Sequence, residues 1–80
     1  MKVRVTVMLK DGVLDPQGKA IAHALHVLDF GSVGEVRAGR VIELEIAETD
    51  ADKARAQGDA MARALLANLV IEDFTVEVVA

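Results

Sequence analysis

Both ends of the chain alternate between apolar and polar residues, and this pattern constrains the fold more than any other. The first alternating run covers residues 1–10, and Asp11-Gly12 ends it. The second covers residues 71–79, with Phe74, Val76 and Val78 on one side. A period of two indicates a β-strand with one buried face. Both ends are therefore predicted to be strands of a sheet that is covered on one face.

Two helices are predicted between these strands. Asp15-Pro16 suits a helix start, because Asp caps free amides and Pro fits the first helical position. The first helix should stop at Gly31, and its apolar face is formed by Ile21, Ala24, Leu25 and Leu28. The second should start at Thr49 or Asp50 and end at Asn68. Its buried line is formed by Ala54, Gly58, Met61 and Leu65.

Residues 33–38 have the pattern of a short strand, and residues 41–47 form another with Ile42, Leu44 and Ile46 inward. Gly39-Arg40 between them is expected to be the tip of a hairpin. The resulting order is β-α-β-β-α-β. We therefore predict one α+β domain over residues 1–80, a ferredoxin-like two-layer sandwich with a four-stranded antiparallel sheet and two helices on one face. Arg4 should then face Glu43 or Glu45 on one side and Glu77 on the other.

The composition narrows the possible functions. The formal net charge of −4 gives no attraction for nucleic acid or for an anionic membrane. The absence of cysteine excludes disulfides, thiol catalysis and thiolate metal sites, and favours a cytoplasmic location. No apolar run approaches the ~18 residues of a membrane span. An enzyme that acts alone is not expected.

The remaining chemical groups do not form an active site. His23 and His26 share one helix face, but a metal site would need a third ligand close by. The Gln17-Gly18 pair invites comparison with acylphosphatases, yet the arginine and the catalytic asparagine of those enzymes are missing. Lys19, His23 and His26 form a basic stripe, either a solvated helix face or a surface for a partner. We expect no metal and no cofactor on this chain.

Two exposed turns are the candidate contact surfaces for a partner, because their residue choices exceed what a loop requires. The candidate interface residues are Asp15, Pro16, Gln17, Gly18, Lys19, His23, Arg37, Gly39 and Arg40. A chain this small also gains stability from association, since one core below ~70–80 residues contributes only ~3–5 kcal/mol. A homodimer is therefore expected.

Several segments resemble the PurS family, the small subunits of phosphoribosylformylglycinamidine synthase. They cover Met1-Lys2-Val3, Leu9 to Ile21, His23-Ala24-Leu25, Val36 to Arg40 with Ile42-Glu43-Leu44, Leu65 to Asn68, and Val70 to Phe74. The stretch Asp15-Pro16-Gln17-Gly18-Lys19-Ala20 is the most specific. Leu69, Phe74 and Arg40 depart from the proline, tyrosine and lysine that are common in the family.

The resemblance implies a non-catalytic adaptor in de novo purine biosynthesis. The complex would contain the ATP-dependent synthetase subunit PurL, which would bind ATP and Mg, and the glutamine amidotransferase subunit PurQ. It would convert formylglycinamide ribonucleotide, ATP and glutamine into formylglycinamidine ribonucleotide, ADP, phosphate and glutamate. The small subunit would bridge the larger two and assist ammonia transfer. Two alternatives stay open, namely a free-standing small-molecule regulatory module with this fold and a stand-alone hydrolase.

Overall fold

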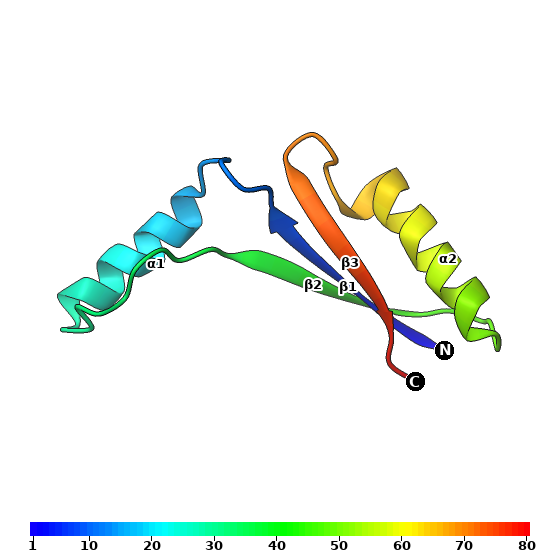
Figure 1. The fold of residues 1–80 in the computed structure, drawn as a ribbon. Helices are drawn as coiled ribbons and strands as arrows, with labels where there is room; N and C mark the ends of the chain where they lie inside the picture. The colour runs from blue at the N-terminus through cyan, green and yellow to red at the C-terminus, as the bar shows by residue number, and fades with distance from the viewer.

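The computed structural model describes residues 1–80, which form a three-stranded antiparallel sheet and two helices. Strand β1 is central and pairs with β2 on one side and with β3 on the other. Figure 1 shows α2 beside the sheet, whereas α1 projects away from it. The elements in chain order are β1 (Lys2–Leu9), α1 (Pro16–Val27), β2 (Gly39–Glu45), α2 (Ala51–Met61), the π-helical turn η1 (Ala62–Leu66) and β3 (Glu72–Val78).

The strand register places complementary charges opposite each other on the open face of the sheet. Arg4 of β1 lies opposite Glu43 of β2 and Glu77 of β3. Its guanidinium nitrogens lie 3.0 Å from a carboxylate oxygen of each. The predicted pairing of Arg4 with Glu43 and Glu77 is thus confirmed. Cross-strand pairs of this kind contribute only ~0.2–1 kcal/mol each, so they set the register more than the stability.

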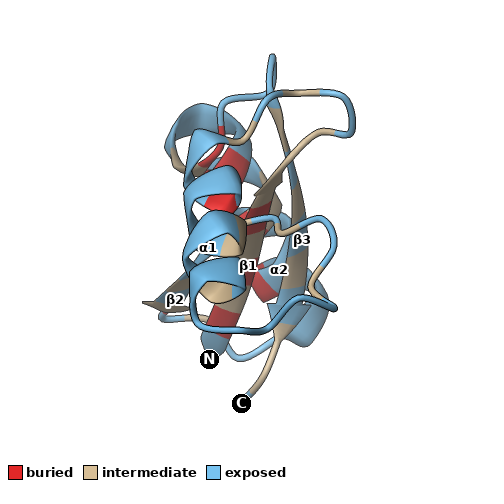
Figure 2. Cartoon of the chain, turned by 90° about the vertical axis from the view of Figure 1, so that its left-hand side faces the viewer, coloured by how far each residue is buried: buried red, intermediate tan, exposed pale blue.

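The core lies between β1 and α2. Val3, Val5 and Val7 are almost completely buried, and Ala54 and Ala62 cover them from the helix side. Gly58 allows the close approach expected from the sequence, because a Cβ atom there would lie 2.8 Å from Val3 Cγ1. Figure 2 shows the buried residues gathered along β1 and α2, while most of α1 is exposed.

The prediction of a four-stranded sheet is wrong, because residues 33–38 form no strand. Gly39-Arg40 is accordingly not a hairpin tip, and these two residues begin β2. The physical reason is that the polar backbone of residues 33–38 is directed at α1. The Ala38 amide donates to the Asp15 carboxylate at 2.9 Å, and the Val33 carbonyl lies 2.7 Å from His26 Nε2. The chain therefore extends away from β1 before β2 begins.

The expectation of two helices on one face, and with it the ferredoxin-like sandwich within one chain, is also wrong. Helix α2 packs on β1 and β3, but α1 has no extensive contact with any strand. The molecule is consequently elongated, with extents of 48 × 26 × 14 Å. Its radius of gyration of 15.9 Å exceeds the ~12 Å expected for a compact chain of this length. Ile21 and Leu28 of the apolar helix face remain exposed.

The helix ends follow the capping residues closely. Asp15 caps α1 as predicted, and Asp50 caps α2 by accepting from Asp52 and Lys53 amides. Helix α1 ends at Val27, before the expected stop at Gly31, and Asp29 adopts a left-handed φ of 72°. None of the helices has the length and apolar character needed to cross a membrane.

Candidate functional site

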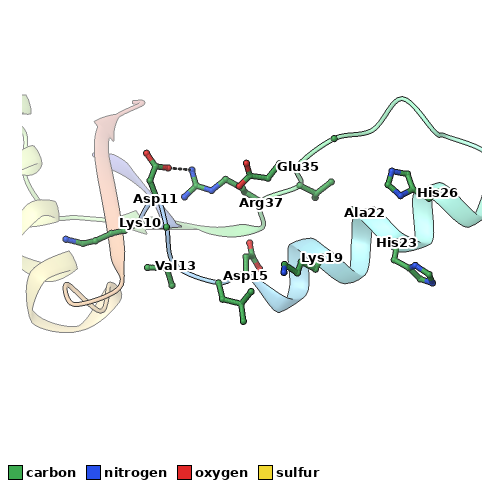
Figure 3. Close-up of a pocket in the computed structure, with 14 residues that line it drawn as sticks. Lys10, Asp11, Val13, Asp15, Lys19, Ala22, His23, His26, Glu35 and Arg37 are labelled. Atoms are coloured by element: carbon green, nitrogen blue, oxygen red, sulfur yellow. Dashed lines mark hydrogen bonds and ion pairs between the residues drawn. The ribbon is translucent and has the colours of Figure 1, made fainter.

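A groove of about 590 Å³ lies where α1 meets the two segments that join it to the sheet. One wall is the face of α1 that carries Lys19 and His23, and the other walls are residues 10–15 and 34–37. Figure 3 shows these side chains around the groove, with Arg37 directed at Asp11. Asp15, Lys19, His23 and Arg37, all predicted as interface residues, are brought together here.

The basic groups of the groove differ in their availability. Arg37 pairs with Asp11 at 3.1 Å and donates to the Leu9 carbonyl, and Lys10 lies 3.7 Å from Asp73. By contrast, the side chains of Lys19 and His23 are exposed and make no hydrogen bond or ion pair. These two side chains are therefore the donors that remain for an acidic group, and Glu35 is the one acidic side chain of the groove that makes neither a hydrogen bond nor an ion pair.

Asp15 is engaged within the chain. One carboxylate oxygen accepts from the Gly18 amide at 2.8 Å, and the other accepts from the Ala38 amide at 2.9 Å. Both hydrogen bonds lower the pKa of Asp15 from its ordinary value, and the bond from the Gly18 amide has the larger effect, followed by the bond from the Ala38 amide. Because both oxygens are used, Asp15 orients the site more than it offers a free contact.

The other predicted interface residues lie outside the groove. Pro16 and Gln17 form the exposed first turn of α1, and Gly18 is buried beneath it. Gly39 and Arg40 begin β2. The Arg40 guanidinium binds both Glu72 oxygens, at 2.7 and 3.0 Å, and also donates to the Leu66 carbonyl. Arg40 therefore holds the turn between η1 and β3.

Sequence reasoning missed several residues of the groove. Lys10, Asp11 and Glu35 line it together with Val13 and Val36. Periodicity gives no signal for Lys10 and Asp11, which lie where the first alternating run ends, and it predicts residues 33–38 to be a strand inside a sheet. Only the placement of α1 beside this segment brings Glu35 and Val36 opposite Lys19.

Comparison with known proteins identifies the relatives of this chain. The family model described as PurS, phosphoribosylformylglycinamidine (FGAM) synthase, matches residues 2–80. The chain belongs to the PurS family. Subunit PurS of phosphoribosylformylglycinamidine synthase from Bacillus subtilis is 48% identical over 77 residues, which are 96% of this chain and 90% of that protein. PurS chains are subunits of FGAM synthase in purine biosynthesis, and the resemblance found in the sequence is thus confirmed.

Solved PurS structures share the architecture of this chain. A Bacillus subtilis PurS structure has a TM-score of 0.86 and 47% identity, and the match covers 99% of this chain and 98% of that one. A PurS structure from Methanocaldococcus jannaschii, described as a subunit of formylglycinamide ribonucleotide amidotransferase in the purine biosynthetic pathway, has a TM-score of 0.85 and 38% identity, covering 95% of this chain and 92% of that one. The structure described as PurLQS from Thermotoga maritima matches with a TM-score of 0.86 and 29% identity, covering 95% and 93%.

Proposed function

We propose that this PurS chain is the non-catalytic adaptor of an FGAM synthase complex. It bridges the synthetase subunit PurL and the glutaminase subunit PurQ and assists ammonia transfer between them. PurL binds ATP and Mg, and the complex works in the cytoplasm. Family membership supports this proposal, as does the similarity to a chain in a structure described as PurLQS.

The observation that carries the proposal is that α1 has two different free surfaces on opposite sides. Successive helical residues are rotated by about 100°, so Lys19 and His23 point away from Ile21 and Leu25. The Lys19 side forms the polar groove, whereas the Ile21 side is apolar and exposed. An adaptor needs two surfaces that can be occupied at once, and these two do not overlap.

We assign the apolar side of α1 to a second copy of this chain. The isolated protomer leaves Ile21 and Leu28 in water and the outer edge of β2 unpaired. A free strand edge and an uncovered apolar helix both favour association. If two copies pair their extended residues 33–45 antiparallel about Gly39, residues 33–38 of each copy add a fourth strand to the sheet of the other. Helix α1 of one copy then covers the sheet of the other, which completes the sandwich that a single chain lacks.

We assign the polar groove to an acidic segment of a larger subunit. Lys19 and His23 are its unpaired donors, and the floor offers Ala22 and Val36 for apolar contact. The candidate residues Pro16 and Gln17 precede Lys19 in the exposed first turn of α1. Arg37 supports the groove wall from the side of residues 34–37.

Reconstitution tests this adaptor function. Glutamine-dependent synthase turnover should require this chain together with PurL and PurQ. Lys19→Glu should weaken assembly with the larger subunits by at least about tenfold, because it replaces an attraction by a like-charge repulsion. Lys53→Glu is the matched control, since Lys53 is an exposed and unpaired lysine on α2. Equal turnover without this chain would refute the adaptor function, and equal assembly of both variants would refute the groove as the contact.

One observation favours the alternative of a small-molecule regulatory module. The groove volume of about 590 Å³ lies within the range of ~300–1,000 Å³ that is typical of ligand sites. Calorimetry of the isolated chain with amino acids and nucleotides separates the two functions. The adaptor function predicts no binding heat without the larger subunits, whereas saturable binding that Lys19→Glu abolishes would support the regulatory module.

A further inference from the structure

The Asp-Pro-Gln-Gly stretch at residues 15–18 forms a joint between α1 and residues 33–38. Residues 33–38 contact α1 and its N-cap at three points along their length. Ala38 donates to Asp15, the Val36 carbonyl packs on Gly18, and the Val33 carbonyl lies 2.7 Å from His26 Nε2. We call α1 together with residues 33–38 the arm.

The arm meets the sheet through a narrow connection. Residues 10–14 and the junction of Ala38 with Gly39 are its covalent links, and α1 makes no extensive contact with a strand. The Arg37 side chain adds two hydrogen bonds from the arm to the chain near the end of β1, one to Asp11 and one to the Leu9 carbonyl. Within a single chain, the direction of the arm therefore depends on a few hydrogen bonds and not on a packed core.

Asp15 connects the two segments of chain at the base of the arm, the start of α1 and the end of residues 33–38. Its Oδ1 accepts from Gly18 inside α1, and its Oδ2 accepts from Ala38, the last residue before β2. Its own carbonyl accepts the first helical bond, from Lys19. One side chain thus ties the start of the helix to the residue that leads into β2.

We propose that Asp15 is a positioning residue that holds the start of α1 against Ala38 and so fixes the direction of α1 relative to β2, which continues from Ala38. Gly18 permits the joint, because a Cβ atom there would overlap the Val36 carbonyl oxygen. The proposal deepens the proposed function, on which it rests, since the arm presents the apolar side of α1 to a second copy. The Asp-Pro-Gln-Gly residues then act mainly inside the chain, whereas Lys19 acts outside it.

Asp15→Asn tests the hydrogen bond from Ala38 without removing the cap of α1. Asparagine caps helices as well as aspartate does, so the Gly18 amide keeps its acceptor. Its amide group replaces the oxygen that Ala38 uses, and a bond to a charged acceptor is lost. In hydrogen exchange measured on the full chain, Ala38 should exchange between about tenfold and a hundredfold faster in Asp15→Asn, while Gly18 stays protected. Gln17→Ala, in the same exposed turn, is the control and should leave both amides unchanged.

The arm direction is measured by the distance between two spin labels. The chain has no cysteine, so cysteines placed at Val27 of α1 and Lys53 of α2 are the only labelling sites. The labelled chain also carries Leu28→Glu, which is expected to dissociate the proposed homodimer, so that no second copy holds α1 and only distances within one chain are measured. With Asp15 and Gln17 unchanged, this background should give one narrow distance distribution, which broadens with Asp15→Asn and not with Gln17→Ala.

An equally narrow distribution in Asp15→Asn, or unchanged exchange of Ala38, would overturn the proposal. Circular dichroism of Asp15→Asn verifies that α1 is still formed. If that variant fails to fold, Gly18→Ala supplies the second test, and an unchanged label distance there also contradicts the joint. None of these measurements involves PurL or PurQ, so a failed adaptor function and a failed joint are distinguished.

Discussion

Gly18 of α1 packs directly against the backbone of Val36, which lies in the segment that returns toward the sheet. A Cβ atom at position 18 would overlap the Val36 carbonyl oxygen and lie 2.9 Å from its carbonyl carbon. Backbone atoms cannot rotate out of the way as a side chain can. The close approach of α1 to this segment therefore requires glycine at position 18.

Gly18→Ala is expected to destabilise the chain by about 1–3 kcal/mol, the usual cost of overpacking. The added methyl group must push α1 away from residues 33–38. Urea unfolding measures the loss. Gly31→Ala is the control, because a Cβ atom at position 31 would contact nothing within 4 Å. A Gly18→Ala variant as stable as Gly31→Ala would show that this contact is not tight.

Gly58→Ala tests the packing of α2 on the sheet. Alanine gains about 1 kcal/mol over glycine within a helix. Its Cβ atom would, however, lie 2.8 Å from Val3 Cγ1 and 3.0 Å from Val76 Cγ1, and such overpacking costs about 1–3 kcal/mol. We expect a net loss of about 1 kcal/mol in urea unfolding. A more stable variant would mean that the two valines adjust freely, and Gln57→Ala on the exposed side serves as reference.

The ion pair of Arg40 and Glu72 should make stability depend on pH. The Arg40 guanidinium, followed by the Asn68 amide, holds the pKa of Glu72 below its ordinary value of 4.5. Glu72 has only 12% of its side chain exposed. A carboxyl group whose pKa is lower in the folded state stabilises the fold at pH values above its pKa in the unfolded chain. This stabilisation is lost as the pH falls through the pKa of the folded state.

Thermal unfolding of Glu72→Gln therefore checks this dependence. The variant should unfold at a lower temperature than the wild type at pH 7, by an amount that corresponds to about 1–2 kcal/mol for a bond between charged groups. The difference should shrink steadily as the pH falls below 4.5. A difference that stays constant over this range would exclude the ion pair as its cause.

Local patterns predicted the elements that local contacts determine. The alternation of residues 1–10 predicted β1. The charges of Arg4, Glu43 and Glu77 predicted the strands that pair with it on either side. The caps at Asp15 and Asp50 gave the helix starts. Residues 33–38 could not be placed in this way, because their partner is decided by the bond from Ala38 to Asp15, 23 positions away. The groove was missed for the same reason.

Leu28→Glu should dissociate the proposed homodimer. Leu28 belongs to the apolar side of α1 and is 64% exposed, so a charge there costs the isolated protomer little. In a dimer the charge would be buried without a partner, which is strongly destabilising. Val27→Glu is a matched control, because Val27 is 68% exposed and rotated by about 100° around the helix. Sedimentation should show monomers for Leu28→Glu alone, and dimers of both variants would refute this interface.

Inserting Asn-Gly between Ala38 and Gly39 should convert the proposed dimer into a monomer. The apolar pattern of residues 33–38 and 41–47 is that of a hairpin, yet the chain continues straight from Ala38 into β2. Asn-Gly favours the two-residue turn that reverses a strand. The arm would then fold back on its own β2, and α1 would cover its own sheet, giving the four-stranded sandwich within one chain.

Two measurements check this insertion. Sedimentation should show a monomer, and scattering should give a radius of gyration near the ~12 Å of a compact chain, below the present 15.9 Å. A Gly-Ser-Gly-Ser insertion between Gly31 and Ser32, outside the joint, should leave the dimer intact. A dimer that persists after the Asn-Gly insertion would mean that residues 33–38 do not pair with a second copy.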